Sequence, residues 1–190
     1  MLNVIDSAGI TNAVKLCKKN GADAILVFYH MGVENVSEPT EAQKNAVKYA
    51  LDAGANFVIG SHPHVVGPTT TQYSSAINDT VFVAYSLGNF LSNQYWRYTD
   101  AGVILKLHIQ KNITKQVTKF KSANYTPTWV YRGDGSKKMH IIFPANMAFD
   151  TLKLPAYLQA SHQQKMQEAF NDTKSIITKY NPLILLNTTY

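Results

Sequence analysis

The chain has 190 residues, of which 45% are hydrophobic, and it carries a formal net charge of +6 with one cysteine. This length and apolar content suffice for a buried core, which excludes a wholly disordered chain. Cys17 alone excludes an internal disulfide and a Cys-x-x-Cys metal site, and we predict an inert, partly buried thiol. The apolar runs are shorter than the ~20 residues that cross a bilayer. The first residues show no signal peptide, so we expect either a cytoplasmic start or a chain cut from a longer protein, and we favour the second.

Two buried strands joined by a helix are predicted early in the chain. A short helix over residues 11–19 precedes a continuous apolar run over residues 24–29, the pattern of a strand buried on both faces. Ser37-Glu38-Pro39 opens a second helix that ends at Gly54, and residues 57–59 form the next strand. In such a βαβ unit the strands run parallel, so their carboxyl ends meet at one edge of the sheet. The inward side chains of the first helix are Ala13, Val14, Leu16 and Cys17.

Mainly antiparallel strands are predicted after the βαβ unit. The segments with partial alternation are residues 81–85, 102–109, 115–121, 128–131 and 139–142, with turns at Lys111-Asn112 and Gly133-Asp134-Gly135. Residues 154–180 are predicted to be mainly helical, and residues 181–190 have no assignable pattern. We therefore predict an α/β fold with one domain over residues 1–150 and a helical extension over residues 151–190.

Basic residues concentrate between positions 106 and 138, where Asp134 is the single acid. They are Lys106, Lys111, Lys115, Lys119, Lys121, Arg132, Lys137 and Lys138. A solvated strand face is the ordinary explanation of such a run, and a surface for an acidic polymer is the functional one. No RNA- or DNA-binding signature accompanies the charge, so nucleic acid is not an expected partner.

Three of the six histidines follow the two predicted parallel strands. His30 ends the first strand, while His62 and His64 flank Pro63 directly after the second. Proline fixes its own backbone angle and Gly60 lets the chain turn off the strand, so one stiff loop presents both imidazoles. An isolated His-x-His pattern also arises among structural histidines. A third imidazole at the same sheet edge favours a site for a divalent transition metal, with all three histidines as ligands.

Glu34 and Asn89 are further candidates for this site. Glu34 follows a glycine turn, where an exposed acid is the ordinary interpretation and an interaction with substrate or a ligand is the functional one. Asn89 is predicted to hold a tight turn beside the site through side-chain-to-backbone hydrogen bonds, with direct ligand contact as the alternative. Phe90 is predicted to lie in the core. The remaining histidines, His108, His140 and His162, are interpreted as structural.

Several segments resemble, in order and spacing, the later motifs of one known family. They are residues 22–34, Glu41-Ala-Gln43, Asp52-Ala-Gly54-Ala, Val58-Ile-Gly-Ser-His-Pro-His-Val65, Tyr85-Ser-Leu-Gly-Asn-Phe90 and Thr126-Pro-Thr-Trp129-Val. The family is that of the CapA-type poly-γ-glutamate capsule biosynthesis proteins, relatives of the calcineurin-like metallophosphoesterases. Met31 departs from its pattern, because relatives usually carry tryptophan there.

The resemblance implies a metallophosphoesterase-like αββα sandwich with two divalent ions, of Mn, Fe or Zn, at the strand ends. His30 and His62 would ligate one ion and His64 the other, and the pair would clamp a phosphoryl group for attack by a bridging water. The implied function is a metal-dependent hydrolytic or transfer reaction in capsule biosynthesis, with a phosphoester or an acidic polymer such as poly-γ-glutamate as substrate. The alternative is a non-catalytic module that binds a polyanion or serves assembly.

The early motifs of this family, a Gly-Asp, an Asn-x-Glu segment and an Asn-His pair, are absent from this sequence. The resemblance therefore implies that the chain holds part of a centre, is inactive alone, and is completed by an amino-terminal part of the same protein. It also implies a cell-surface location of the intact protein through a membrane anchor outside this soluble chain.

Overall fold

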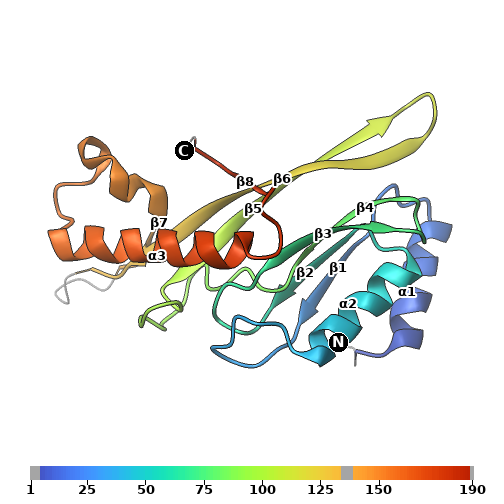
Figure 1. Ribbon diagram of the computed structural model, residues 1–190, viewed down its shortest axis with the longest axis horizontal. Coiled ribbons are helices and arrows are strands. Elements are labelled where there is room, and N and C mark those ends of the chain that lie inside the picture. The colour runs from blue at the N-terminus through green and yellow to red at the C-terminus, as the bar shows by residue number, and fades with distance from the viewer. Residues whose placement is uncertain (1–4, 134–138, 189–190) are drawn as a thin grey trace.

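The computed structural model describes residues 5–133 and 139–188, which form two sheets and three α-helices. The first sheet has the order β1-β2-β4-β3; the second has the order β5-β6-β7, with β8 beside β6. Figure 1 shows α1 and α2 on one face of the first sheet and the long β5–β6 hairpin over the other. The elements are α1 (Ser7–Lys19), β1 (Leu26–His30), α2 (Glu41–Ala53), β2 (Phe57–Ser61), β3 (Thr69–Ser74), β4 (Asp79–Ala84), β5 (Ala101–Asn112), β6 (Val117–Tyr131), β7 (Ile141–Pro144), the 3₁₀ turns η1 (Ala145–Phe149) and η2 (Thr151–Lys153), α3 (Ala160–Thr178) and β8 (Leu185–Leu186).

The predicted βαβ unit is confirmed. β1 and β2 run parallel, and the register pairs His30 with Ser61 at their carboxyl ends. α2 begins at Glu41 rather than near Pro39, because Thr40 and Gln43 form a capping box in which each side chain bonds the backbone of the other. Gly54 ends the helix at φ 99°, in the left-handed conformation that glycine adopts without strain.

The first helix is longer and more exposed than predicted. Asp6 accepts a hydrogen bond from the backbone of Gly9, so α1 begins at Ser7. Val14 is the buried side chain of α1, whereas Leu16 is 57% exposed. Cys17 is exposed as well, so the prediction of a partly buried thiol is wrong.

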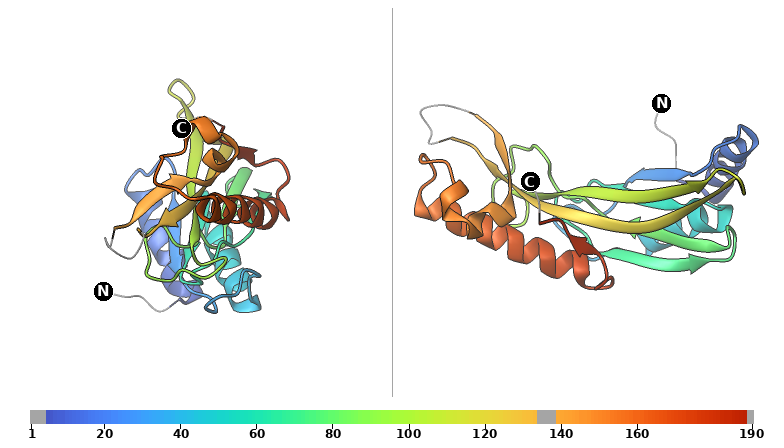
Figure 2. Two further views of the ribbon diagram at one scale, coloured as in Figure 1. Left: turned by 90° about the vertical axis from the view of Figure 1, so that its left-hand side faces the viewer. Right: turned by 90° about the horizontal axis from the view of Figure 1, so that it is seen from above.

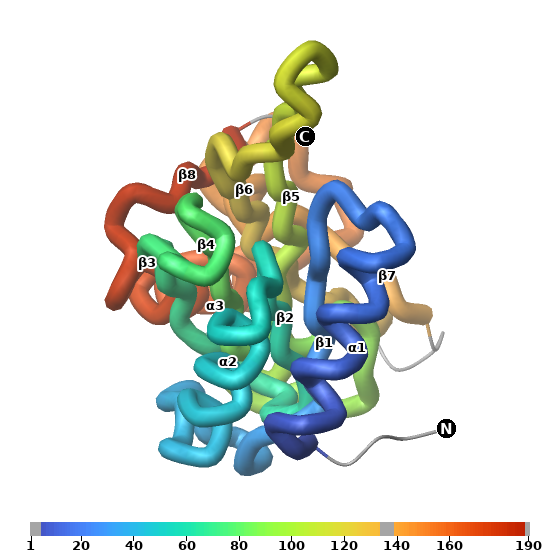
Figure 3. Tube along the Cα trace, turned by 90° about the vertical axis from the view of Figure 1, so that its right-hand side faces the viewer, coloured from blue at the N-terminus to red at the C-terminus, as the bar shows by residue number. Residues whose placement is uncertain are grey.

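β1 is an edge strand, and the prediction that it is buried on both faces is wrong. Tyr29 is buried against α2, where its hydroxyl donates to the carbonyl oxygen of Ala46 at 2.9 Å. Leu26 and Phe28 point the other way and are 51% and 60% exposed. The core between the two sheets covers β2 and β4 with residues of β5 and β6, and it leaves β1 open at the side (Figure 3).

The part of the chain after β2 combines confirmed and altered elements. β4 pairs parallel to β2 and antiparallel to β3. β3 was not predicted from the sequence. The two strands predicted over residues 115–121 and 128–131 are one strand, β6, which forms a hairpin with β5 whose turn lies after Asn112. The predicted turn at Gly133-Asp134-Gly135 falls largely outside the described residues.

The helical C-terminal segment is confirmed as α3, preceded by the two 3₁₀ turns. One face of β6 packs against two different elements. Tyr125 lies in the core between the two sheets, and Trp129 lies in a cluster with Met166 and Phe170 of α3. α3 thus lies next to the first sheet, under the same strand (Figures 1 and 2). The division into residues 1–150 and 151–190 stays a prediction. None of the helices in the described part is long and apolar enough for a membrane span.

Candidate metal centre

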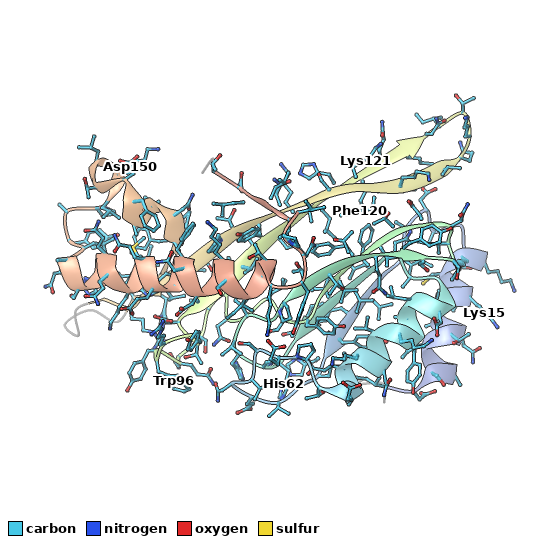
Figure 4. The ribbon with its side chains drawn as sticks, viewed as in Figure 1. Lys15, His62, Trp96, Phe120, Lys121 and Asp150 are labelled. Atoms are coloured by element: carbon cyan, nitrogen blue, oxygen red, sulfur yellow. The ribbon has the colours of Figure 1, made fainter. Side chains whose placement is uncertain are left out.

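The three predicted histidines lie together where β1 and β2 end. Because His30 pairs in register with Ser61, the next residue, His62, lies beside it. Nδ1 of His62 is 3.1 Å from Nε2 of His30, with ring centroids 4.8 Å apart. The ring of His64 lies 6.3 Å from that of His62. The convergence expected from the parallel strands is present in the structure, and Figure 4 shows His62 at this end of the sheet.

The loop that carries two of these imidazoles has an unusual backbone. His62 and His64 adopt φ of 108° and 63°, in the left-handed region that L-residues rarely occupy. Pro63 between them is buried, and its carbonyl oxygen accepts a hydrogen bond of 2.7 Å from the backbone of Asn35. Non-glycine residues in such conformations persist where the surroundings hold them, and they cluster at functional sites.

Gly60 allows the strand before this loop to approach its neighbour closely. A Cβ atom at this position would lie 2.0 Å from the carbonyl oxygen of Tyr85. The sequence suggested that Gly60 provides a turn, but its role in the structure is this close contact between backbones. The loop that starts after Tyr85 is thereby held against the histidines.

Asn89, on the loop after β4, reaches the histidine cluster. Its Oδ1 lies 3.0 Å from Nδ1 of His64, and its Nδ2 donates to the carbonyl oxygen of Thr99 at 2.8 Å and to Oε1 of Gln94 at 3.2 Å. The predicted side-chain-to-backbone bond is present, although it spans the loop of residues 89–99 rather than a tight turn. Asn89 is 8% exposed, so these bonds form away from solvent.

Glu34 and Phe90 lie on exposed parts of the rim. Glu34 is exposed on the loop after β1. Phe90 is 55% exposed, so the prediction that it lies in the core is wrong: Asn89 turns inward and its neighbour turns outward. Three further apolar side chains of this loop, Leu91, Tyr95 and Trp96, are 49% exposed or more, and Trp96 lies on the same side as His62 in Figure 4. Sequence reasoning did not identify this exposed apolar loop, although its aromatic residues adjoin the Gly-Asn-Phe motif.

The spacing of the first two imidazoles fits two ligands of one metal ion. The nitrogens of His30 and His62 are separated by 3.1 Å and form a hydrogen bond between the two rings. With metal–nitrogen distances of about 2.0–2.1 Å, two ligands at adjacent positions of one ion lie roughly 3 Å apart, so the same arrangement also fits a bound ion. Within residues 5–133 and 139–188, no three His, Cys, Asp or Glu side chains form a group that could hold an ion unaided. The residues present therefore fit part of a ligand set that needs further donors.

Comparison with known proteins gives one consistent result. Residues 2–94 match the profile of a family described as bacterial capsule synthesis protein PGA_cap. The chain is 35% identical over 126 residues to the PGA biosynthesis protein CapA of Bacillus subtilis (strain 168), across 65% of this chain and 31% of that protein. It is also 35% identical over 97 residues to the capsule biosynthesis protein CapA of Bacillus anthracis, across 51% of this chain and 22% of that protein. The chain spans less than a third of the length of these curated relatives.

Proposed function

Since the chain belongs, through residues 2–94, to the bacterial capsule synthesis protein family, we propose that it supplies the histidine side of a metal-dependent phosphoesterase-type site used in capsule biosynthesis. The observation that carries this proposal is the 3.1 Å separation between ring nitrogens of His30 and His62. His64 stands beside His62 on the same loop, as a ligand for a second ion would. The intact protein acts at the cell surface on a phosphoester or on an acidic polymer such as poly-γ-glutamate.

The chemistry divides between the ions and the chain. Bound divalent ions would act as Lewis acids and lower the pKa of a coordinated water. The chain would hold the imidazoles in place through the stiff Pro63 loop, while the exposed loop of residues 90–98 borders the site. Glu34 is exposed next to Asn35, whose backbone bonds the carbonyl oxygen of Pro63, and this neighbourhood supports a contact between Glu34 and a substrate. Within residues 5–133 and 139–188, no carboxylate joins the histidines in a group that could hold an ion. The carboxylate that commonly bridges two ions would therefore come from another part of the intact protein.

The open edge of β1 favours a place for that missing part. Leu26 and Phe28 expose apolar surface on an unpaired strand edge, which proteins normally cover or protect. An amino-terminal segment of the intact protein, pairing with β1, would bury this surface and bring its side chains to the end of the strand, next to His30. Its acids would then complete the ligand set.

The test uses the full-length protein. Metal content and hydrolysis of bis-p-nitrophenyl phosphate are measured for the wild type, for His62→Ala and His64→Ala, and for His140→Ala as an exposed histidine away from the cluster. We expect both cluster variants to lose metal and activity and the control to retain them. Unchanged metal content and activity in both cluster variants would refute the proposal.

A second candidate function, non-catalytic binding of an acidic polymer, is favoured by one observation. The β5–β6 hairpin extends past the rest of the molecule (Figures 1 and 2), and a groove of about 670 Å³ lies along its end. Its lining includes Lys111, Lys115, Lys119 and Lys121. These four ammonium groups place positive charge along the groove, which suits a polymer of carboxylates through charge attraction.

Part of this basic charge is already neutralised. Lys111 lies 2.8 Å from Asp23, and Lys119 lies 3.8 Å from Asp79. Lys115 and Lys121 have no ion pair with an acid in the part of the chain that the structure describes. Arg132, from the same basic stretch, does not line this groove. Its Nη1 donates to the carbonyl oxygen of Asn93 at 2.7 Å. The last basic residues of the stretch, Lys137 and Lys138, lie outside the described residues.

Binding of polyglutamate to the chain, at low and high salt and with and without chelator, separates the two functions. The variant Lys115→Gln/Lys121→Gln is compared with Lys165→Gln/Lys174→Gln, which removes the same charge from exposed positions of α3. Salt-sensitive binding that ignores chelator and weakens only in the hairpin variant supports the module. Equal weakening in both variants would assign the binding to net charge alone.

A further inference from the structure

The hydrogen bonds of Asn89 determine which of its two terminal atoms faces His64. The carbonyl oxygen of Thr99 can only accept a hydrogen bond, so the atom 2.8 Å from it must be the amide nitrogen of Asn89. The other terminal atom, which lies 3.0 Å from Nδ1 of His64, is therefore the oxygen.

This orientation fixes the proton on His64. An amide oxygen can only accept, so Nδ1 of His64 must carry the hydrogen in the bond between them. In a neutral imidazole with Nδ1 protonated, Nε2 holds the free lone pair. We propose that Asn89 is a positioning residue that holds His64 in the Nδ1–H tautomer and makes Nε2 its acceptor nitrogen.

The surroundings of Asn89 make this constraint rigid. Its backbone nitrogen donates to the carbonyl oxygen of Ala101 at 3.1 Å, and a Cβ atom at Gly102 would lie 2.3 Å from its carbonyl oxygen. Gly88 before it adopts φ 69°. The residue is clamped against β5 at its backbone and bonded at both ends of its amide, so it cannot rotate to suit the other tautomer of His64 without losing several bonds.

The consequence is that the two histidines of one loop present opposite ring nitrogens. His62 directs Nδ1 toward His30, whereas His64 holds Nδ1 toward Asn89 and leaves Nε2 for another partner. Nε2 as a metal ligand rests on the proposed function, whereas the tautomer itself does not. A histidine whose second nitrogen donates to a fixed acceptor is the usual arrangement around metal ions, because the bond orients the ring.

The experiment measures the tautomer directly, on the metal-free chain at a pH where the imidazole is neutral. Long-range nitrogen–proton NMR correlations distinguish Nδ1–H from Nε2–H, and the resonances of His64 are identified by their loss in His64→Gln. We expect predominantly Nδ1–H in the wild type. In Asn89→Leu, which keeps the volume and removes the acceptor, the ratio of the two tautomers should shift toward Nε2–H by at least about fivefold, the effect of losing one buried hydrogen bond.

Two further variants keep the result interpretable. Asn89→Asp keeps an acceptor for His64 but replaces the donor to Thr99 with a second oxygen, so it disturbs the loop and should still keep Nδ1–H. That result separates loss of the acceptor from a general disturbance of the loop. Asn181→Leu removes a buried amide that bonds Thr71 elsewhere and should leave His64 unchanged. A wild type already in the Nε2–H form, or a tautomer ratio that does not respond to Asn89→Leu, would overturn the inference. The metal content of the full-length protein tests the proposed function separately: a full-length wild type that binds no metal refutes the proposed function and leaves the tautomer result standing.

Discussion

The backbone of His62 provides a quantitative test of the site. At φ 108° this residue occupies a conformation that costs a non-glycine residue roughly 1–2 kcal/mol. Replacing it with glycine removes that cost but adds freedom to the unfolded chain, worth about 0.4–1 kcal/mol. Comparing His62→Gly with His62→Ala cancels the loss of the imidazole, which both variants share. We expect the glycine variant to have the higher free energy of unfolding, by about 1 kcal/mol.

The matched control is His140, which is exposed, lies outside regular structure and does not have a positive φ. There glycine should be less stable than alanine, by about 0.4–1 kcal/mol, because only the unfolded-state effect remains. Urea unfolding followed by circular dichroism measures all four variants, and the expected difference at position 62 corresponds to about 2–4 °C in Tm for a chain of this size. If glycine is the less stable choice at both positions, the loop is not strained and its stiffness is no argument for a site.

Three further outcomes follow from contacts near the site. Gly60→Ala would drive a Cβ atom to 2.0 Å from the carbonyl oxygen of Tyr85, and we expect a loss of at least ~2 kcal/mol in urea unfolding. Burial raises the pKa of Tyr29 to about 12, above its value near 10 in the unfolded chain. The stabilisation by neutral Tyr29 is therefore complete below about pH 10 and lost as the pH rises to about 12. Tyr29→Phe should weaken the alkaline loss of stability, while Tyr85 and Tyr125, whose pKa values burial also raises, maintain the rest of it. Exposed Cys17 should react fully with a thiol reagent in the native protein, as mass spectrometry would detect.

The sequence predicted the histidine cluster because two local signals sufficed. Apolar runs and a helix between them identify a parallel βαβ unit, and its topology alone brings His30 next to His62. The sequence could not predict that β1 is an edge strand with one exposed face. An apolar run has the same pattern whether or not a neighbouring layer covers that face. The exposure of Phe28 depends on the position of the second sheet, which is set by contacts far apart in the chain.

Other features needed contacts between distant segments. Asn89 bonds His64 and Thr99, so its position depends on a loop closed by β5, and only its neighbour Gly88 gave a local signal. β3 carries three consecutive threonines and lacks apolar alternation, so its pairing with β4 was not evident from pattern. The side chain of Phe90 points outward because the inward direction is already occupied by Asn89.

The two proposed functions can be separated because their sites lie at opposite ends of the first sheet. Two lysines of the groove form ion pairs with acids at the amino ends of the parallel strands. Lys111 pairs with Asp23, just before β1, and Lys119 pairs with Asp79, the first residue of β4. The histidines lie at the carboxyl ends, roughly 15 Å away for strands of five or six residues. A polymer in the groove therefore leaves the imidazoles free. We expect His62→Ala to keep salt-sensitive polyglutamate binding and Lys115→Gln/Lys121→Gln to keep the metal content of the full-length protein. If either variant loses both properties, the groove and the histidine cluster act as one site, and the separation inferred from the strand directions is wrong.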